Sequence, residues 1–207
     1  MKFVAITLLL LTSIFLIACS ANQASNKISN SELENLASKY GGVYVFNEKF
    51  EKEITTKEKI RREAELAIVN ASKTDAEMRK NLKGFDTKYP QTLSNGKKYY
   101  TRWIDYENQT GKKAEIPEIY INKIKEFIGD DFNKQKPELL MLYLYEDNGI
   151  AIPITVRASY TYVKTKYGLF GDEGRGVKLS KQNFVTRTSR SEFHIINGKF
   201  ERVSKDK

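Results

Sequence analysis

Residues 139–163, LLMLYLYEDNGIAIPITVRASYTYV, hold the pattern that decides the fold. Strand-favouring residues lie on both sides of Asn148-Gly149, and an Asn-Gly pair favours the type I′ turn. The stretch therefore predicts a β-hairpin that turns at these two residues. Such a turn places Tyr145 opposite Ile152, and side chains two residues apart share a face. This register predicts one buried face, made of Tyr143, Tyr145, Ile152, Ile154, Val156 and Tyr160.

The opposite face of the hairpin is more apolar than a solvated face should be. An antiparallel sheet that meets water on one side normally shows polar residues there. We therefore expect a helix, a partner chain or a ligand to cover part of this second face. It carries Leu140, Leu142, Leu144, Ala151, Pro153, Thr155 and Arg157.

Two short helical patterns and a brief strand lie outside the hairpin. A capping box at Ser31-Glu32-Leu33-Glu34 predicts a helix that stops at Gly41-Gly42, before a strand over residues 43–46. Pro117 is a favoured first helical residue, and it predicts a helix that ends at Gly129.

The longest helical pattern begins at a second capping box, Thr55-Thr56-Lys57-Glu58, and reaches residue 83. Thr74-Asp75-Ala76-Glu77 can cap a fresh start, so one long helix and two helices with a bend are both possible. An apolar stripe at helical spacing predicts a core face. Its members are Ile60, Ala64, Ala67, Ile68, Ala71, Met78 and Leu82.

Further strand patterns complete the fold prediction. Residues 98–107 are rich in aromatic and strand-favouring types, and Asn197-Gly198 predicts a second hairpin turn. Residues 168–176 are glycine-rich but lack the Lys-Ser/Thr pair of a phosphate-binding loop, so we interpret them as a mobile loop between strands. These elements predict an α+β fold with an antiparallel, curved sheet of about four to six strands and about three helices packed on one face.

Composition limits the chemistry of the chain. Its 35 Lys and Arg against 26 Asp and Glu give a net charge of +9, and the basic residues are spread along the sequence. A solvated basic surface and a dedicated anion-binding face both fit this spread, and we do not expect nucleic acid as a partner. One Cys and one His leave only oxygen ligands for a metal and allow no internal disulfide. We therefore expect no metal or other cofactor.

The N-terminus resembles a bacterial lipoprotein signal peptide. Lys2 gives a cationic start, residues 3–17 are largely apolar, and Leu16-Ile17-Ala18-Cys19 stands where a lipobox would. The resemblance implies cleavage before Cys19 and acylation of that residue, so that acyl chains hold the protein in the membrane. It also implies a bacterial envelope location, and Ser20 in place of Asp favours the outer membrane of a cell that has one.

Two other interpretations of this segment remain open. A plain secretory signal has the same charged start and apolar run but releases the whole chain. A transmembrane anchor needs about 20 apolar residues, whereas Thr7, Thr12 and Ser13 interrupt this shorter run. On the lipoprotein interpretation, residues 1–18 are removed, residues 19–28 form a lipidated linker, and residues 29–207 form a single domain.

Catalytic signatures are weak in this sequence. His194 is the only candidate for general-base chemistry at neutral pH, and the second hairpin places it opposite Glu201 as an ordinary cross-strand pair. The neighbouring acids Asp130-Asp131, Glu146-Asp147 and Asp172-Glu173 lie beside glycines or in turns, where acids are common. We therefore expect no catalytic residues.

The candidate binding residues are the tyrosines and arginines of the predicted sheet and the tip of the glycine-rich loop. Aromatic and cationic side chains suit contacts with proteins and anionic polymers, although aromatic residues are also ordinary sheet residues. The candidate face is Tyr143, Tyr145, Arg157, Tyr160, Tyr162, Arg187 and Arg190. The candidate contact loop is Gly171, Arg175 and Gly176.

The order of elements also looks like the curved-sheet layout of NTF2-like and cystatin-like domains over residues 31–203. This likeness implies a sheet that cups a pocket or a dimer interface, but a fold alone does not choose a function. We expect an envelope lipoprotein whose non-catalytic domain binds a protein, cell-wall polymer or anionic lipid partner. The alternatives are a small-ligand carrier or enzyme with a pocket in the sheet, and an inhibitor or exclusion-type interaction protein. A homodimer through the sheet is a further possibility.

Overall fold

The computed structural model describes residues 28–172, 174, 176–187 and 191–203. The expected signal peptide, Cys19 and nearly all of the expected linker lie outside these residues, as do Arg175 and Arg190. In the described part of the chain, no helix is both long and apolar enough to span a bilayer.

A five-stranded sheet forms the centre of the molecule, in the order β10-β9-β1-β6-β3. The middle strand, β1 (Gly42–Val45), pairs antiparallel with β6 (Thr155–Ser159) and parallel with β9 (Ser191–Ile196). The two edges are β3 (Glu138–Met141) and β10 (Lys199–Val203), both antiparallel to their neighbours. The expected α+β class, dominated by antiparallel pairs, is confirmed.

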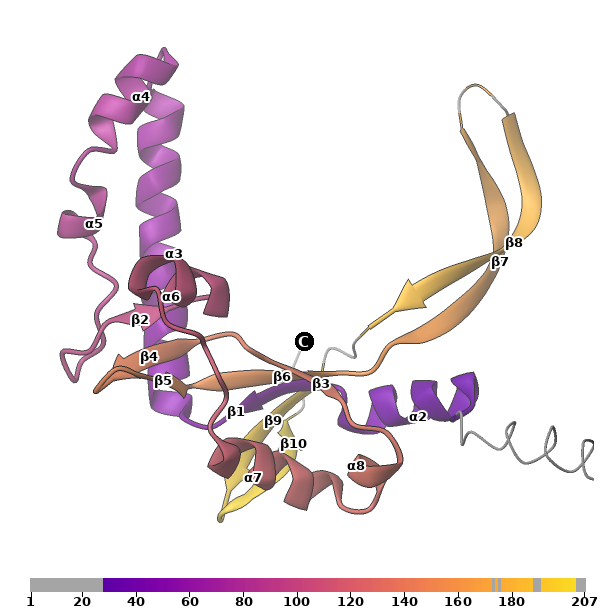
Figure 1. Cartoon of the computed structure of the whole chain (residues 1–207). Helices are drawn as coiled ribbons and strands as arrows, with labels where there is room; N and C mark the ends of the chain where they lie inside the picture. The colour runs from indigo at the N-terminus through magenta and orange to yellow at the C-terminus, as the bar shows by residue number, and fades with distance from the viewer. Residues whose placement is uncertain (1–27, 173, 175, 188–190, 204–207) are drawn as a thin grey trace, which may run out of the picture.

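Helices cover one face of this sheet. They are α2 (Asn30–Tyr40), α7 (Glu118–Ile128) and α8 (Asp131–Lys134) (Figure 1). The main core lies between them and the sheet, where the ring of Tyr44 on β1 stacks on that of Phe193 on β9 at 4.7 Å. The helix expected after Pro117 is confirmed, and Gly129 ends it with a φ of 68°.

A second, three-stranded sheet contains the hairpin of the decisive stretch. It consists of β2 (Tyr99–Tyr100), β4 (Leu144–Asp147) and β5 (Ile150–Pro153). Asn148 and Gly149 both have positive φ, and Tyr145 pairs with Ile152, so the predicted turn and register are confirmed. This sheet borders a second core cluster of four buried residues: Ile54, Leu93, Tyr99 and Ile154.

The single buried face predicted for this hairpin is wrong, because a β-bulge interrupts the alternation. The carbonyl oxygen of Tyr143 accepts from the amides of both Ile154 and Thr155, at 2.8 and 3.0 Å. Two residues therefore face one, and the side chains beyond the bulge exchange faces. Val156 joins the main core, whereas Ile154 belongs to the second cluster.

The bulge also divides the second face of the hairpin. Leu144 and Ala151 lie in the main core, and Thr155 is buried. Near the turn of the hairpin, this face is therefore covered by the protein's own core. Farther from the turn, Arg157 on β6 is exposed.

The long helix α3 (Glu48–Ala71) begins seven residues earlier than expected. Asn47 caps it by accepting a hydrogen bond from the amide of Phe50, and the second capping box lies inside the helix. A new helix, α4 (Asp75–Asn81), starts after Thr74, whose hydroxyl accepts from the amide of Glu77. The two-helix alternative is therefore confirmed.

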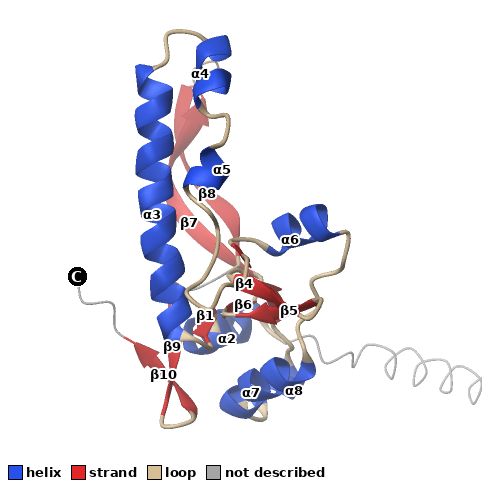
Figure 2. Ribbon diagram, turned by 90° about the vertical axis from the view of Figure 1, so that its left-hand side faces the viewer, coloured by secondary structure: helices blue, strands red, loops and turns tan. Residues whose placement is uncertain are grey.

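The apolar stripe predicted as the core face of this helical region is wrong. The only buried residue of α3 is Ile54, and none of the seven stripe residues is buried. Ile60, for example, is 50% exposed. The reason is that α3 spans about 36 Å and stands clear of the sheet, with α4 and the short α5 (Phe85–Lys88) along one side (Figures 1 and 2).

Residues 98–107 are only partly a strand. After β2, helix α6 (Trp103–Thr110) begins, and Gly111 ends it at a φ of 71°. Asp105 in its first turn pairs with Arg102, the residue before the helix, at 2.6 Å. A carboxylate near the positive end of a helix is favourable, so this local pairing outweighs the strand tendency of the aromatic residues.

The glycine-rich segment is mostly strand, and the long loop expected at residues 168–176 is wrong. β7 (Tyr162–Asp172) pairs with β8 (Gly176–Thr186) in an antiparallel two-stranded sheet, here called the ribbon. The ribbon extends about 36 Å from the five-stranded sheet (Figure 1). β8 ends at Thr186, and the next strand, β9, begins at Ser191 in the five-stranded sheet.

The ribbon and the helical arm, defined as α3 and α4, rise from the same side of the five-stranded sheet. Figure 1 shows the helical arm on the left and the ribbon on the right, with an open gap between them. The turned view in Figure 2 also shows both rising above the sheet. The molecule is therefore U-shaped.

Candidate binding surface

The base of the U is the face of the five-stranded sheet turned away from α2 and α7. The strand register places Arg157 of β6 between Leu140 of β3 and Val43 of β1, with Glu192 of β9 next in the row. We call these four residues the floor. Tyr44, in contrast, points to the opposite, helix-covered face.

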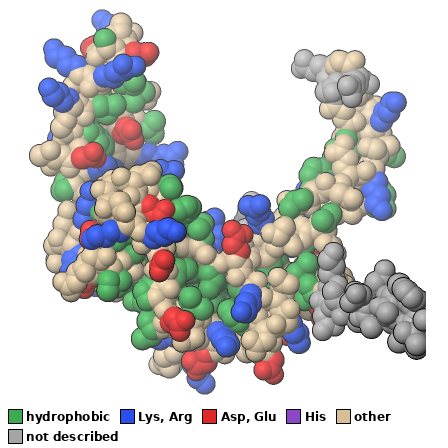
Figure 3. Space-filling model, viewed as in Figure 1, with side chains coloured by type: hydrophobic (Ala, Val, Ile, Leu, Met, Phe, Trp, Pro, Cys, Tyr) green, Lys and Arg blue, Asp and Glu red, His purple; other side chains and the backbone are tan. Residues whose placement is uncertain are grey.

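The floor is accessible and combines apolar and charged side chains. Arg157 is exposed, and its guanidinium has no ion-pair partner among the described residues. Val43 and Leu140 are half-buried beside it. The space-filling view shows the gap as a hollow with basic and acidic side chains around its base (Figure 3). Such a mixed surface is typical of the interfaces between proteins.

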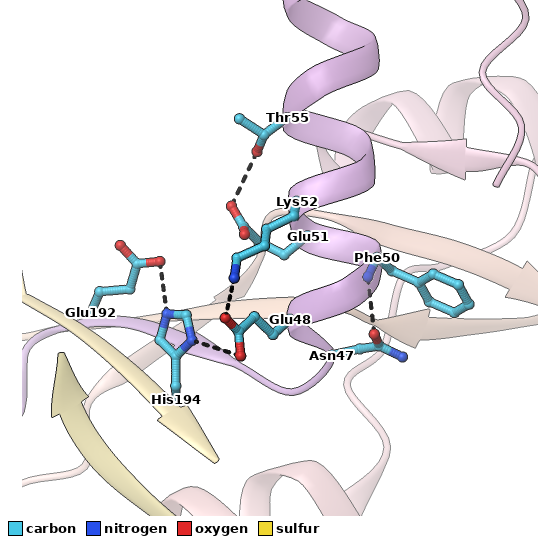
Figure 4. Close-up of polar contacts among 8 residues, drawn as sticks. All are labelled: Asn47, Glu48, Phe50, Glu51, Lys52, Thr55, Glu192 and His194. Atoms are coloured by element: carbon cyan, nitrogen blue, oxygen red, sulfur yellow. Dashed lines mark hydrogen bonds and ion pairs between the residues drawn. The ribbon is translucent and has the colours of Figure 1, made fainter. Parts of the chain in front are cut away.

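A polar cluster fixes the root of the helical arm to the sheet. The Nε2 atom of His194 lies 3.0 Å from a carboxylate oxygen of Glu192, and its Nδ1 lies 3.7 Å from one of Glu48 (Figure 4). Glu48 also pairs with Lys52 one turn along α3, and this contact holds the pKa of the Glu48 carboxyl below its ordinary range. The imidazole thus joins β9 to the first turn of α3.

The contacts in this cluster give His194, the only histidine of the chain, a structural role. His194 lies opposite Glu201 as the register predicted, but its polar contacts are with Glu192 and Glu48. Its side chain is only 12% exposed. Among the described residues, no group of three or more His, Cys, Asp and Glu side chains is placed to hold a metal ion.

The ribbon presents two different faces. In an antiparallel pair, residues directly opposite one another share a face. The odd-numbered face of β7 carries Val163, Tyr167 and Leu169, opposite Val185, Lys181 and Leu179 of β8, with Val177 near the tip. These side chains are largely exposed: Tyr167 by 76%, Leu169 by 71% and Leu179 by 78%. We call this the apolar face.

The second face of the ribbon is basic and aromatic. It carries Lys164 opposite Phe184, and Phe170 opposite Lys178. The rings of Phe170 and Phe184 lie 5.8 Å apart, and the ammonium of Lys166 lies 5.5 Å from the centre of the Phe184 ring. Cation–π contacts of this kind hold lysine stems along the ribbon and leave their charge near water.

The first helix fixes the root of the ribbon. The side-chain amide of Asn30 donates to the carbonyl oxygen of Val163 at 2.8 Å and accepts from its amide at 2.6 Å. One turn along α2, Glu34 lies 4.0 Å from Lys164. The ribbon therefore leaves the molecule beside the start of α2, where the chain arrives from its N-terminal segment.

The structure does not bring the candidate binding residues of the sequence to one surface. Tyr143 and Tyr145 pack against the second cluster, and Tyr160 is buried in the main core. The Tyr160 hydroxyl has no hydrogen-bond partner within the described residues, and burial raises its pKa. Arg157 lies on the floor, and Tyr162 lies at the root of the ribbon.

The remaining candidates lie near the two ends of the ribbon. Arg187 is exposed just after β8. In the contact loop, Gly171 pairs with Val177 and Gly176 with Asp172, at the far end of the ribbon. The apolar face was not predicted, although apolar residues at positions 163, 167 and 169 and at 177, 179 and 185 alternate along the two strands.

Carboxylates from two of the neighbouring acid pairs, Asp130-Asp131 and Glu146-Asp147, form ion pairs with lysines. Asp131 accepts from Lys134 at 2.7 Å and from the Tyr40 hydroxyl at 3.0 Å. Glu146 accepts from Lys112 at 2.9 Å, and Asp147 pairs with Lys97. These carboxylates are engaged with cations at the surface, which is consistent with local stabilisation.

A groove at the edge of the molecule is separate from the floor. It has a volume of about 240 Å³ and lies between α7 and the β9–β10 hairpin, where Phe127, Ile195 and Phe200 line it with Lys123 and Lys199. It therefore lies at the helix-covered side of the sheet.

Comparison of the chain with protein-family models, curated proteins and solved structures found no match.

Proposed function

We propose that this protein is a lipid-anchored protein of the bacterial envelope whose non-catalytic domain binds a partner protein between its helical arm and its ribbon. Cys19, at the end of the apolar N-terminal run, is the proposed attachment point for the acyl chains. Two or three acyl chains hold a protein firmly in a bilayer, whereas one does not. The domain would then meet partners in or near the same membrane.

The observation that carries this proposal is the open floor between the helical arm and the ribbon. A sheet face flanked by a helical arm and a ribbon gives a partner three surfaces to contact at once. The exposed Arg157 is available for a charged hydrogen bond with a carboxylate of the partner, and such groups are enriched in binding hot spots. The half-buried Val43 and Leu140 supply apolar contact around it.

Site-specific photo-cross-linking in cells tests this proposal. A benzoylphenylalanine at Leu140 lies on the floor and leaves Arg157 in place, and one at Lys125 lies exposed on α7, on the opposite side of the sheet. We expect the Leu140 position to give one discrete cross-linked protein that the Lys125 position does not give. Identical adducts from both positions, or none from Leu140 in folded protein, would show that the floor binds no partner protein.

A charge reversal supplies the second measurement. Arg157→Glu removes the cation from the floor without touching the core, because this side chain is exposed. The loss of one charged hydrogen bond at the centre of an interface lowers affinity about tenfold or more. We therefore expect the cross-link formed from a neighbouring floor position, Leu140, to fall by a similar factor in this variant.

A further inference from the structure

We propose that the apolar face of the ribbon docks on the surface of an anionic lipid bilayer, with the ribbon lying flat in the interface. This contact is separate from the partner site on the floor. It would act as a second attachment of the domain beside the acyl anchor, and it would fix the orientation of the U relative to the membrane.

The first reason is the size of the uncovered apolar surface. Tyr167, Leu169 and Leu179 are each more than 70% exposed, and Val177 and Val185 are 65% and 68% exposed on the same face. A lone two-stranded hairpin is marginally stable in water, and among the residues that the structure describes no third strand or helix runs along most of the ribbon (Figure 1). A surface that accepts this whole row would stabilise the ribbon.

The second reason is charge. The two strands carry four lysines, Lys164, Lys166, Lys178 and Lys181, and one acid, Asp172, which gives 4 − 1 = +3. Lys181 lies on the apolar face itself, opposite Tyr167, whereas Lys164, Lys166 and Lys178 lie on the other face. Two ribbons packed by their apolar faces would bring the two Lys181 side chains and two positively charged ribbons together, which disfavours a second copy as the occupant. Anionic head groups complement the net charge: Lys181 adds about 1 kcal/mol of attraction, and the lysines of the other face add less because the attraction falls off within a Debye length.

The third reason is the geometry of the ribbon. Beyond Val163, whose amide and carbonyl bond to Asn30, no strand of the described residues pairs with the outer edges of the ribbon, and unpaired backbone groups cannot enter the hydrocarbon core. At interfacial depth, about 5–10 Å, the apolar side chains are buried while the edges stay among head groups and water. Tyr167 suits this layer because its ring is apolar and its hydroxyl is polar.

The position of the root is consistent with the same surface. Asn30 binds the backbone of Val163, and at most about 40 Å of extended chain joins Asn30 to Cys19. If Cys19 is acylated as proposed, the leaflet that holds its chains is within reach of the ribbon. Only this step depends on the proposed anchor.

Fluorescence quenching by brominated lipids tests the docking. The mature protein carries Trp103→Phe, which removes its only tryptophan, and then either Tyr167→Trp on the apolar face or Phe170→Trp on the opposite face. Each variant is reconstituted in vesicles of brominated phosphatidylcholine and phosphatidylglycerol, and circular dichroism confirms the fold. We expect quenching about threefold stronger for Tyr167→Trp, because the two faces lie at different depths.

Salt and lipid charge provide the remaining arms. In 1 M NaCl, where the Debye length is about 3 Å, quenching of the Tyr167→Trp variant should fall, and it should also fall in pure phosphatidylcholine. Vesicle-bound protein that shows no quenching at either position would overturn the docking but not the anchor. If the protein dissociates from zwitterionic vesicles, its acyl anchor does not hold it in the bilayer. The docking is then measured by adding the free protein to anionic vesicles. A blue-shifted Tyr167→Trp emission without lipid would mean that protein covers the face, which also overturns the docking.

Discussion

Replacing Ile54 with alanine should detach the helical arm from the rest of the molecule. Ile54 is fully buried, and it is the only buried residue of α3. The substitution removes three carbon atoms, which costs about 2.4 kcal/mol in transfer free energy at about 0.8 kcal/mol each. The cavity left beside Tyr99 and Ile154 raises the expected loss of unfolding free energy to about 3–4 kcal/mol.

Ile60→Ala is the matched control on the same helix. Ile60 is half exposed, so it loses less burial, and alanine has the better helix propensity. We expect a change below about 1 kcal/mol, measured like the first by urea unfolding followed with circular dichroism. Equal losses for the two variants, or a larger loss for Ile60→Ala, would refute the argument that the buried Ile54 supplies the main apolar contact of the helical arm with the rest of the molecule. A larger loss of unfolding free energy for Ile60→Ala is the result expected if the apolar stripe predicted from the sequence were the core face.

Two further predictions concern the root of the ribbon and the acid stability of α8. Asn30→Ala removes two hydrogen bonds to Val163, worth about 1 kcal/mol each, so the amide of Val163 should exchange with deuterium at least about tenfold faster. Hydrogen bonds from Lys134 and Tyr40 hold the pKa of Asp131 below its ordinary value of 3.8. Its contribution is therefore full above pH 3.8 and lost as the pH falls further, so wild type and Asp131→Asn should differ in unfolding free energy at neutral pH and converge in acid.

Controls for these two predictions are available nearby. In the Asn30→Ala variant, amides of the β9–β10 hairpin should keep their exchange rates, because the lost bonds lie at the ribbon root. A uniform increase in exchange would instead indicate global destabilisation. For Asp131, a difference from Asp131→Asn that persists unchanged below its lowered pKa would contradict the ion-pair explanation.

Local turn chemistry was the part of the fold that sequence predicted well. Asn148-Gly149 and Asn197-Gly198 both form turns with positive φ, and the strands pair in the expected register beside each of them. These predictions succeed because an Asn-Gly pair has few alternatives once strands flank it. The helix between Pro117 and Gly129 succeeds for the same reason, since both ends carry a strong local signal.

The errors arose where tertiary structure decides. The bulge at Tyr143 reverses the facing of every later side chain on β6, and a period-two pattern has no sign of the extra residue. The stripe around Ile60 looks like a core face by spacing, but α3 stands clear of the sheet and has little to pack against. A helical period shows that residues share a face and does not show what covers it.

The candidate site was predicted in part. Arg157 was among the expected binding residues, and the structure places it on the open floor. Tyr160 was grouped with it because the bulge was not foreseen, and the structure buries it instead. The apolar face of the ribbon escaped because the glycines at 168, 171, 174 and 176 suggested a loop, whereas Gly168 and Gly171 lie within β7.

The acyl anchor at Cys19 is the claim on which the proposed location and partners depend, and an intact mass measurement tests it most directly. Protein purified from envelopes with detergent should begin at Cys19 and be heavier than the polypeptide by a diacylglycerol group, with or without a further acyl chain on the new amino group. A free thiol at Cys19, or a mature chain that starts at any other residue, would contradict the account.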